Sequence, residues 1–173
     1  MTRLLDLARR SFAALRCAVN VVAIILLCAM IVLILLQILG RYVFNYSISW
    51  SEEAAIFVQI WLVMLGTGIA MRNRNHVGID ILITRCPPMV QRLAKTASFL
   101  LGAWFLLVLI TGSFSLVTLG LIVKSTALQI PLAIPYAALP VGVSYFLLEF
   151  AIATLPEIRD PSGASHGPGV EAE

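Results

Sequence analysis

The chain consists of four long apolar stretches separated by short polar segments that carry almost all of its charges. Uncharged windows cover residues 17–40, 54–71, 96–123 and 125–148 and are 18 to 28 residues long. A helix needs roughly 20 predominantly apolar residues to cross a bilayer, within a range of about 17–25. The pattern therefore predicts an all-α polytopic membrane protein with four transmembrane helices, at about residues 17–40, 53–72, 96–120 and 131–152.

The composition supports this prediction. The 173 residues are 60% hydrophobic and 12% charged, whereas a soluble domain carries about 25% charged residues. Too few polar side chains remain to cover a soluble core, so we expect one membrane domain over residues 1–155. Residues 156–173 are rich in Pro, Gly, Ser and acidic residues, which predicts a disordered cytoplasmic tail.

The distribution of Lys and Arg predicts the orientation. Nine of these residues precede the first span or lie between the second and third, whereas Arg41 and Lys124 lie in the opposite flanks. Cytoplasmic loops carry the excess of positive charge, so both termini are expected in the cytoplasm. The same asymmetry explains the net charge of +3, which gives no reason to invoke nucleic acid. The first apolar run is longer than a signal-peptide core of about 7–15 residues, so we expect it to remain as an anchor.

Two segments outside the spans carry their own patterns. Residues 1–16 show a helical apolar stripe that predicts an interfacial amphipathic helix leading into the first span. A basic tail that only sets the topology is the alternative. Residues 76–83 are apolar but too short to cross, so we expect a cytoplasmic segment lying on the interface between spans two and three. Pro88 is expected to begin the next helix.

Prolines mark the last span. Pro131 is expected near its start, and Pro140 is expected to kink it or to be relieved by neighbouring helices. Residues 120–129 then form the outer turn between spans three and four.

The connection between the first two spans, residues 40–55, places ionisable side chains at a membrane face, where they are expensive. Arg41, Glu52 and Glu53 could form a docking surface or an ion path. Alternatively, Ser49 and Glu52 form a capping box at the start of the second span, and Arg41 forms a structural ion pair with Glu53 or contacts a partner subunit. We favour these structural interpretations.

Amide side chains extend this charged corner. Gln37 shares a helical face with Arg41, and Gln59 shares a face with Glu52. Two antiparallel helices could therefore present a polar seam that is charged at the rim and lined by amides below.

Tryptophans and small residues are interpreted as architecture. Trp50 is expected in the interfacial aromatic belt, and Trp61 and Trp104 in helix packing. Small residues four apart, as at Gly66 and Ala70, allow close helix approach. The same spacing occurs at Ser98/Gly102, Ala133/Ala137 and Ala138/Gly142.

Catalytic and cofactor chemistry find no support in the sequence. The histidines, His76 and His166, fall outside the spans, so a membrane haem is not expected. No Ser or Cys has a credible His/Asp partnership, and the cysteine spacing suggests no metal site. Glu149 is expected to snorkel at the cytoplasmic boundary. We therefore expect neither an enzyme nor a cofactor, and the lack of an internal repeat argues against a complete secondary transporter.

Several ordered features recur at intervals typical of one family. Arg-Tyr-x-Phe at residues 41–44 leads to Trp-Ser-Glu-Glu at residues 50–53, and Leu-x-Ile-Pro…Tyr…Pro-x-Gly spans residues 128–142. Trp61, Gly66, His76 and Asp80 lie between these motifs. Over residues 40–142 the chain resembles the small membrane subunit of TRAP transporters, the DctQ-type small permease. Lys124, a charge in the outer turn, departs from the pattern.

The resemblance implies a bacterial inner-membrane system. A large DctM-type permease subunit and a periplasmic DctP-type binding protein would be partners, and an ion gradient, usually sodium, would drive uptake of an organic acid such as a dicarboxylate. Substrate and sodium sites are expected in the large subunit. This chain would brace that subunit and help to form the docking platform for the binding protein.

The resemblance also assigns roles to particular residues. Arg41, Trp50, Glu52 and Glu53 would set the geometry of the periplasmic side. His76 and Asp80 would order the cytoplasmic loop.

Two other classes of protein fit the sequence less well. A self-sufficient small proton-coupled exporter would need an acid well inside a span, and the sequence offers only Glu53 and Glu149 near the edges. A membrane-anchor subunit of a redox complex would show a haem absorbance band.

Overall fold

The computed structural model describes residues 2–46, 48–72 and 88–159, which fold into helices joined by short connections. The helices are α1 (Thr2–Tyr42), α2 (Ser49–Arg72), α4 (Pro88–Ile122), α5 (Ala133–Tyr136) and α6 (Ala138–Arg159). Four of them are long and apolar enough to cross a membrane. This confirms the predicted all-α polytopic architecture.

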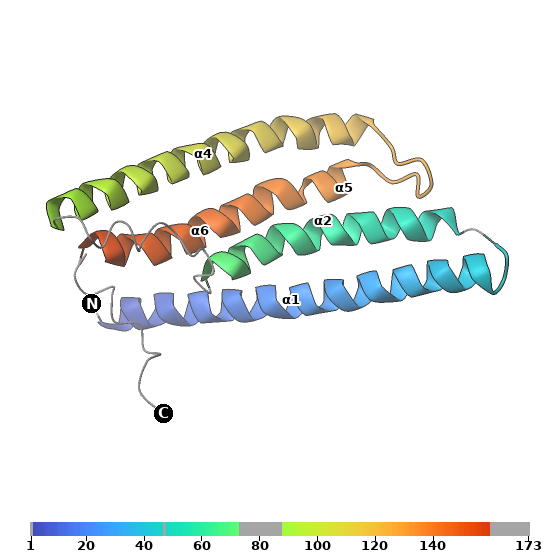
Figure 1. Cartoon of the computed structure of the whole chain (residues 1–173), viewed down its shortest axis with the longest axis horizontal. Coiled ribbons are helices and arrows are strands. Elements are labelled where there is room, and N and C mark those ends of the chain that lie inside the picture. Colours follow the sequence, from blue (N-terminus) through green and yellow to red (C-terminus); the bar gives the residue numbers. More distant parts are fainter. Residues whose placement is uncertain (1, 47, 73–87, 160–173) are drawn as a thin grey trace, which may run out of the picture.

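The long helices lie side by side in a flat row (Figure 1). In this row α1 packs on α2, α2 packs on α6, and α6 packs on α4, so α1 and α4 form the two edges. The short α5 continues the line of α6 at one end and contacts α4 and α2. No other described helix lies on either broad face of the row.

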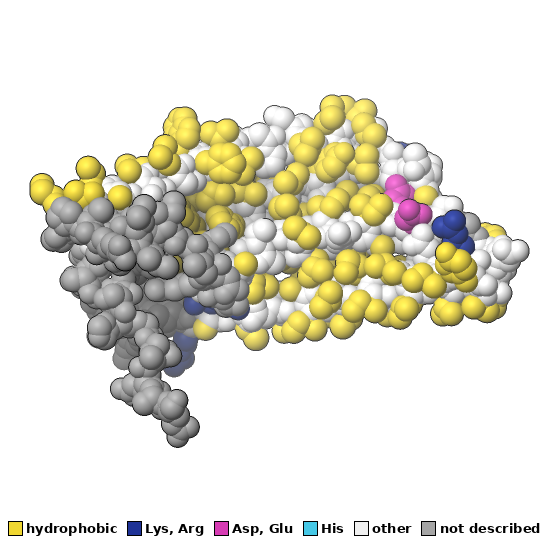
Figure 2. Space-filling view, in the orientation of Figure 1, with side chains coloured by type: hydrophobic (Ala, Val, Ile, Leu, Met, Phe, Trp, Pro, Cys, Tyr) yellow, Lys and Arg dark blue, Asp and Glu magenta, His cyan; other side chains and the backbone are white. Residues whose placement is uncertain are grey.

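Apolar side chains consequently dominate the visible surface (Figure 2). The window of α1 that is apolar enough to span a membrane holds no buried residue. The buried apolar residues among those described are few and lie mostly where α2, α4, α5 and α6 meet: Ala55, Leu65, Leu106, Ala133, Ala138 and Tyr145. Lipid or another protein must cover the rest, because exposed apolar surface of this extent is unfavourable in water.

Helix α1 is longer than a single span. The sequence from Thr2 to Leu39 contains neither glycine nor proline, so nothing interrupts the backbone hydrogen bonds. The amphipathic N-terminal segment and the first span, expected as two consecutive pieces, form one helix of 41 residues.

Close packing of α2 on α6 depends on small residues. A Cβ atom built on Gly142 would lie 2.6 Å from Met64 Cβ, and one built on Gly68 would clash with the Tyr145 ring. The Ala138/Gly142 spacing thus lies at a helix contact, as small residues do when helices pack within a bilayer. Gly66 behaves differently, because a Cβ atom there would meet nothing within 4 Å.

The last span is divided into two helices, α5 and α6. The regular helix is interrupted at Ala137, between α5 and α6, although Ala137 keeps helical backbone angles, with φ at −62° and ψ at −20°. Pro140 lies in the first turn of α6, where a missing N–H leaves no intrahelical hydrogen bond unmade. The interruption lies three residues before Pro140, and the predicted kink at Pro140, or its relief by neighbouring helices, stays a prediction.

The outer turn between α4 and α5 is a compact hairpin over residues 123–132. Leu132 N donates to Val123 O at 3.0 Å, and Ser125 N donates to Ile130 O at 2.9 Å. Lys124 and Pro131 form an antiparallel bridge, and Gln129 takes a positive φ of 56°. Pro131 thus precedes the last helices, while the turn begins and ends about three residues later than residues 120–129.

Other helix ends are compared with the prediction as follows. Helix α4 begins at Pro88, as expected, and α6 continues to Arg159, beyond the expected limit at residue 152. Residues 73–87, which include His76, Asp80 and the expected interfacial segment, lie outside the described residues. The same holds for most of the expected tail, residues 160–173.

Candidate functional site: polar clusters at both ends of the helix row

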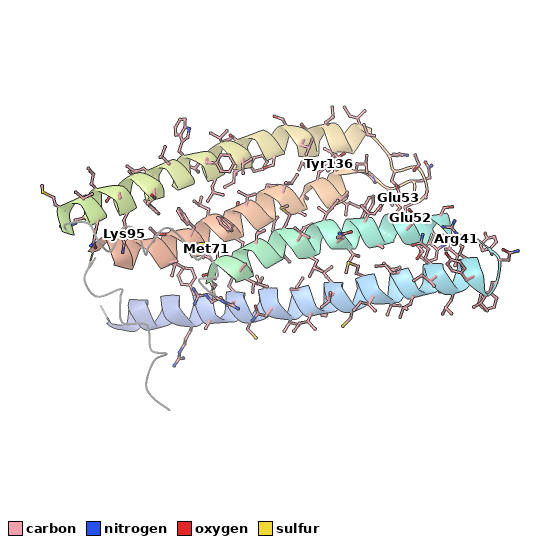
Figure 3. All side chains as sticks on the ribbon, in the orientation of Figure 1. Arg41, Glu52, Glu53, Met71, Lys95 and Tyr136 are labelled. Carbon is pink, nitrogen blue, oxygen red and sulfur yellow. The ribbon has the colours of Figure 1, made fainter. Side chains whose placement is uncertain are left out.

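Two adjacent carboxylates at the start of α2 bind different parts of the chain (Figure 3). Gln37 Nε2, on α1, donates to Glu52 Oε2 at 3.1 Å. Glu53 Oε2 accepts hydrogen bonds from the backbone N–H groups of Ala127 at 2.9 Å and Leu128 at 2.8 Å. Glu52 therefore joins α2 to α1, and Glu53 joins α2 to the 123–132 hairpin.

These contacts correct two predictions. The Glu52 carboxylate is directed at Gln37 rather than back at Ser49, so the capping-box interpretation is wrong. Glu53 is occupied by the hairpin and Arg41 is exposed, so the ion pair between Arg41 and Glu53 is not formed in the part of the chain that the structure describes. A contact of Arg41 with a partner subunit stays a prediction.

The predicted polar seam forms only in part. Gln37 and Glu52 meet at the rim, as their helical spacing indicated. Gln59 lies further along α2 with an exposed side chain, so it extends the polar line without joining the hydrogen bond.

A buried serine at this corner was missed in the sequence. Ser51 is fully buried, and its hydroxyl donates to Leu33 O at 2.8 Å, which ties α2 to α1. Its neighbours Trp50 and Glu52 are exposed. A small polar residue between two conspicuous ones gave no signal by itself, because serine is common in turns.

The tryptophans separate into two kinds. Trp61 Nε1, on α2, donates to Ile134 O at 3.2 Å on α5, which confirms its place in helix packing. Trp104 is 70% exposed on α4, so it does not pack within the described part of this chain, and its packing against a helix of another subunit stays a prediction. Trp50 is 48% exposed and lies near exposed Tyr42 and Tyr46, a composition typical of an interfacial aromatic belt.

The opposite end of the row holds a buried ion pair. Arg16 Nε donates to Glu149 Oε1 at 2.9 Å, and Arg16 Nη2 donates to Glu149 Oε2 at 2.7 Å. Tyr145, one helical turn before Glu149, donates its hydroxyl to Oε1 at 3.1 Å. Glu149 is 1% exposed, so the expectation that it snorkels toward water is wrong. A buried carboxylate requires such partners, because its desolvation is otherwise very unfavourable.

A second polar contact lies at the same end. Arg72 Nη2, at the end of α2, donates to Asn20 Oδ1 on α1 at 3.1 Å. Asn20 is a lone amide inside an apolar run. This isolation is a sequence signal from which its contact with another helix could have been predicted. Within a bilayer, an amide of this kind usually faces another helix.

Together these contacts define what the described side chains can do. In residues 10–46, 48–72 and 89–154 the carboxylates are those of Glu52, Glu53 and Glu149, and each accepts at least one hydrogen bond from another element. The polar groups hold neighbouring helices in register. This arrangement is that of a scaffold.

Comparison with known proteins identifies a transporter family. The sequence model of the family described as "Tripartite ATP-independent periplasmic transporters, DctQ component" matches residues 30–159. A TRAP transporter small permease protein of Haemophilus influenzae is 30% identical over 133 residues, which are 75% of this chain and 74% of that protein.

Two further relatives are matched over a smaller share of their own length. The C4-dicarboxylate TRAP transporter small permease protein DctQ of Vibrio cholerae is 25% identical over 146 residues, with 70% of this chain and 63% of that protein covered. The isethionate TRAP transporter permease protein DctMQ of Oleidesulfovibrio alaskensis is 31% identical over 122 residues. These residues are 66% of this chain but 19% of that protein, so the chain spans only a small part of it.

The matched family is a transporter component rather than an enzyme. Its match covers α2, α4, α5, α6 and the second part of α1, and so includes both polar clusters except Arg16 and Asn20. The chain belongs to the DctQ component family of the tripartite ATP-independent periplasmic transporters.

Proposed function

We propose that this small permease subunit braces a large permease subunit within a tripartite transporter for an organic acid. Both subunits would lie in the bacterial inner membrane, with the termini of this chain in the cytoplasm. Uptake would be driven by an ion gradient, the sodium gradient in view of the family resemblance, and a periplasmic binding protein would deliver the substrate.

The flat row of helices is the observation that carries this proposal. In a four-helix bundle the helices pack around one closed core. Here α1 and α4 lie at opposite edges, and large apolar side chains on both remain exposed, such as Ile24 at 61% and Leu101 at 71%. A broad apolar slab of this kind is suited to lie against a larger membrane protein.

The polar groups support a structural role. Glu52, Glu53 and Glu149 each bind a neighbouring element of the same chain. A transport site needs polar groups that face a substrate or an ion near the middle of the membrane. The carboxylates of the described residues instead lie toward the two ends of the row and hold it together.

The names of relatives support the proposed substrate class and partner. Two of them carry C4-dicarboxylate and isethionate in their names, and both compounds are small organic anions. The DctMQ relative is a permease protein in which this chain matches 19% of the length. We infer that the large remainder corresponds to a separate subunit in the system to which this chain belongs.

The corner at the α1–α2 connection is the part that we assign to the periplasmic side. Arg41 is exposed there beside Tyr42 at 78% and Phe44 at 74% exposure. A charged and aromatic rim of this kind could contribute to the platform on which the binding protein docks, because aromatic residues and Arg are enriched at protein interfaces.

Purification from the native host in mild detergent tests the proposal. We expect a much larger polytopic membrane protein to co-elute with the tagged chain and to be identified by mass spectrometry. Recovery of the chain alone, together with organic-acid transport by that chain in liposomes, would contradict the bracing role.

Arg41→Gln tests the periplasmic corner, with Lys124→Gln as a control at the other outer connection. We expect Arg41→Gln to lower complex yield or uptake without altering substrate preference, and Lys124→Gln to have a smaller effect. A change of substrate preference in Arg41→Gln would place this residue in a substrate site and overturn its structural assignment.

A further inference from the structure

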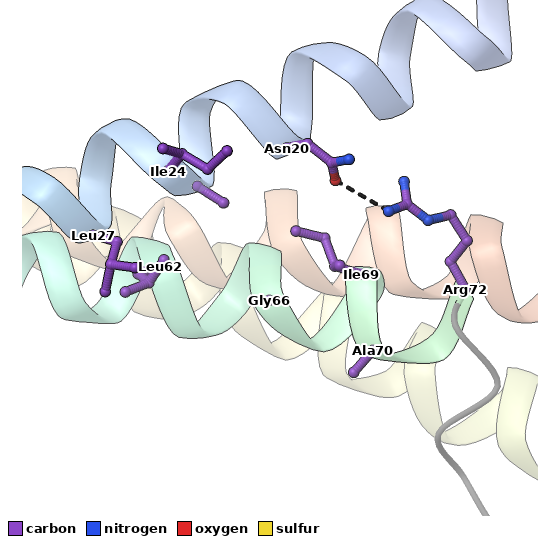
Figure 4. A pocket seen from close by; sticks show the side chains of 9 residues that line it. Asn20, Ile24, Leu27, Leu62, Gly66, Ile69, Ala70 and Arg72 are labelled. Atoms are coloured by element: carbon purple, nitrogen blue, oxygen red, sulfur yellow. Dashed lines mark hydrogen bonds between the residues drawn. The ribbon is translucent and has the colours of Figure 1, made fainter.

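A groove of about 490 Å³ lies between α1 and α2 (Figure 4). Its walls are apolar along most of their length, formed by Ile24 and Leu27 on α1 and by Leu62 on α2. One end is polar, where Arg72 and Asn20 are joined by their hydrogen bond.

The groove exists because Gly66 leaves room between the helices. A Cβ atom on Gly66 would meet nothing within 4 Å, whereas one on Gly142 would approach Met64 Cβ to 2.6 Å. Small residues on the α6 side of α2 thus permit tight packing, while Gly66 opens a space on the α1 side. The space is not filled by a side chain of the described residues.

The charge at the polar end of the groove is positive. Arg72 donates to a neutral amide, and no carboxylate in residues 10–46, 48–72 and 89–154 forms an ion pair with it. The nearby Glu149 is already bound by two donors of Arg16. A guanidinium has five N–H donors, so Arg72 retains donors for an anionic ligand.

The dimensions match one leaflet of a bilayer. Leu62 and Arg72 are ten positions apart, which corresponds to roughly 15 Å along a helix at about 1.5 Å per residue. Half of the hydrocarbon core of about 30 Å has the same depth. The groove therefore runs from the headgroup level toward the middle of the membrane.

We propose that this groove binds an anionic phospholipid. Its phosphate group receives hydrogen bonds from Arg72 and from the amide of Asn20, and one acyl chain lies along Ile24, Leu27 and Leu62, over Gly66. A guanidinium suits a phosphate because it can donate two parallel hydrogen bonds. Basic pockets between transmembrane helices are known to bind anionic headgroups.

Native mass spectrometry of the full chain in mild detergent tests this proposal, with phosphatidylglycerol and phosphatidylcholine as probes. We expect the unmodified chain to retain phosphatidylglycerol in preference to phosphatidylcholine. Arg72→Gln keeps a hydrogen-bonding side chain but removes the charge, and should weaken phosphatidylglycerol retention about fivefold, the effect of one Arg at an anionic membrane surface. Equal retention of both lipids by the unmodified chain would overturn the proposal.

Two matched controls separate the groove from general effects. Arg92→Gln removes an exposed positive charge from α4, and should leave phosphatidylglycerol retention unchanged. Gly66→Leu fills the groove, whereas Gly112→Leu adds the same side chain at a position of α4 that is equally open. Gly66→Leu should reduce retention and Gly112→Leu should not.

A helix of another subunit is the competing occupant of the groove. In that case Gly66→Leu would reduce co-elution of that subunit while the preference for phosphatidylglycerol remained, which would contradict the lipid site. Equal losses in Arg72→Gln and Arg92→Gln would also contradict it, because binding would then follow net charge alone.

Discussion

Arg16 and Glu149 form a two-point salt bridge between α1 and α6, although 133 positions separate them in the chain. The row order places α2 between these helices, so the pair connects elements that otherwise have little contact. Tyr145 adds a third donor to the same carboxylate. The pair thus fixes how the first and last helices lie relative to each other.

Removing one partner of this pair should destabilise the chain. In Glu149→Leu the Arg16 charge loses its partner, and we expect a loss of about 3 kcal/mol, the lower end of the range for buried pairs because the Arg16 side chain is 34% exposed. Thermal unfolding in detergent measures this as a lower Tm. The double variant Arg16→Leu/Glu149→Leu should recover much of the loss, because it leaves no unpaired charge. Additive losses would show that the two residues act independently.

Glu53 should control the order of the 123–132 hairpin. In Glu53→Gln the charge that accepts the Ala127 and Leu128 N–H groups is lost, and charge-assisted hydrogen bonds are the stronger kind. We expect several-fold faster amide hydrogen exchange in peptides that cover the hairpin. Glu52→Gln is the matched control, since Glu52 binds Gln37 instead. Equal exchange rates in the two variants would show that Glu53 does not control the order of the hairpin.

Gly68 should be required for the packing of α2 on α6. An alanine there would place its Cβ atom against the Tyr145 ring, and overpacking of this kind costs about 1–3 kcal/mol. Gly112→Ala adds the same methyl group to α4 where nothing lies within 4 Å, so its Tm should stay close to that of the unmodified chain. If both variants lost the same stability, the loss could not be assigned to the contact with Tyr145.

Trp61 and Trp104 should respond differently to the same substitution. Trp61→Phe removes the indole N–H that donates to Ile134 O, and we expect a loss of about 1 kcal/mol. Trp104 is 70% exposed, so Trp104→Phe should leave the Tm of the isolated chain nearly unchanged. A larger effect at Trp104 would indicate that α4 is covered within the purified chain.

Thiol labelling tests the orientation. In a background without the natural cysteines, we expect Lys124→Cys to react with a membrane-impermeant thiol reagent in spheroplasts, and Arg92→Cys to react only after the membrane is opened. The reason is the excess of Lys and Arg at the Arg92 end of the spans. The reverse pattern would place both termini in the periplasm.

The sequence predicted the elements better than their contacts. Lone polar residues in apolar runs, such as Gln37 and Glu149, were visible as exceptions, because polar groups are rare inside spans. The residues with which they form hydrogen bonds could not be predicted from the sequence. Glu53 was paired with Arg41 in the sequence analysis because both are charged, but the structure brings backbone N–H groups of the hairpin to it.

The sequence sufficed to predict the number of spans and the start of α4 at Pro88, because the length of an apolar run and the properties of proline act locally. It also carried the family signature around residues 40–142. The tertiary structure alone decided that the helices form a flat row, that Arg16 reaches Glu149, and that Gly66 opens a groove while Gly68 closes a contact. These properties depend on which helix faces are neighbours, and contacts between residues far apart in the chain are not encoded in any one local pattern.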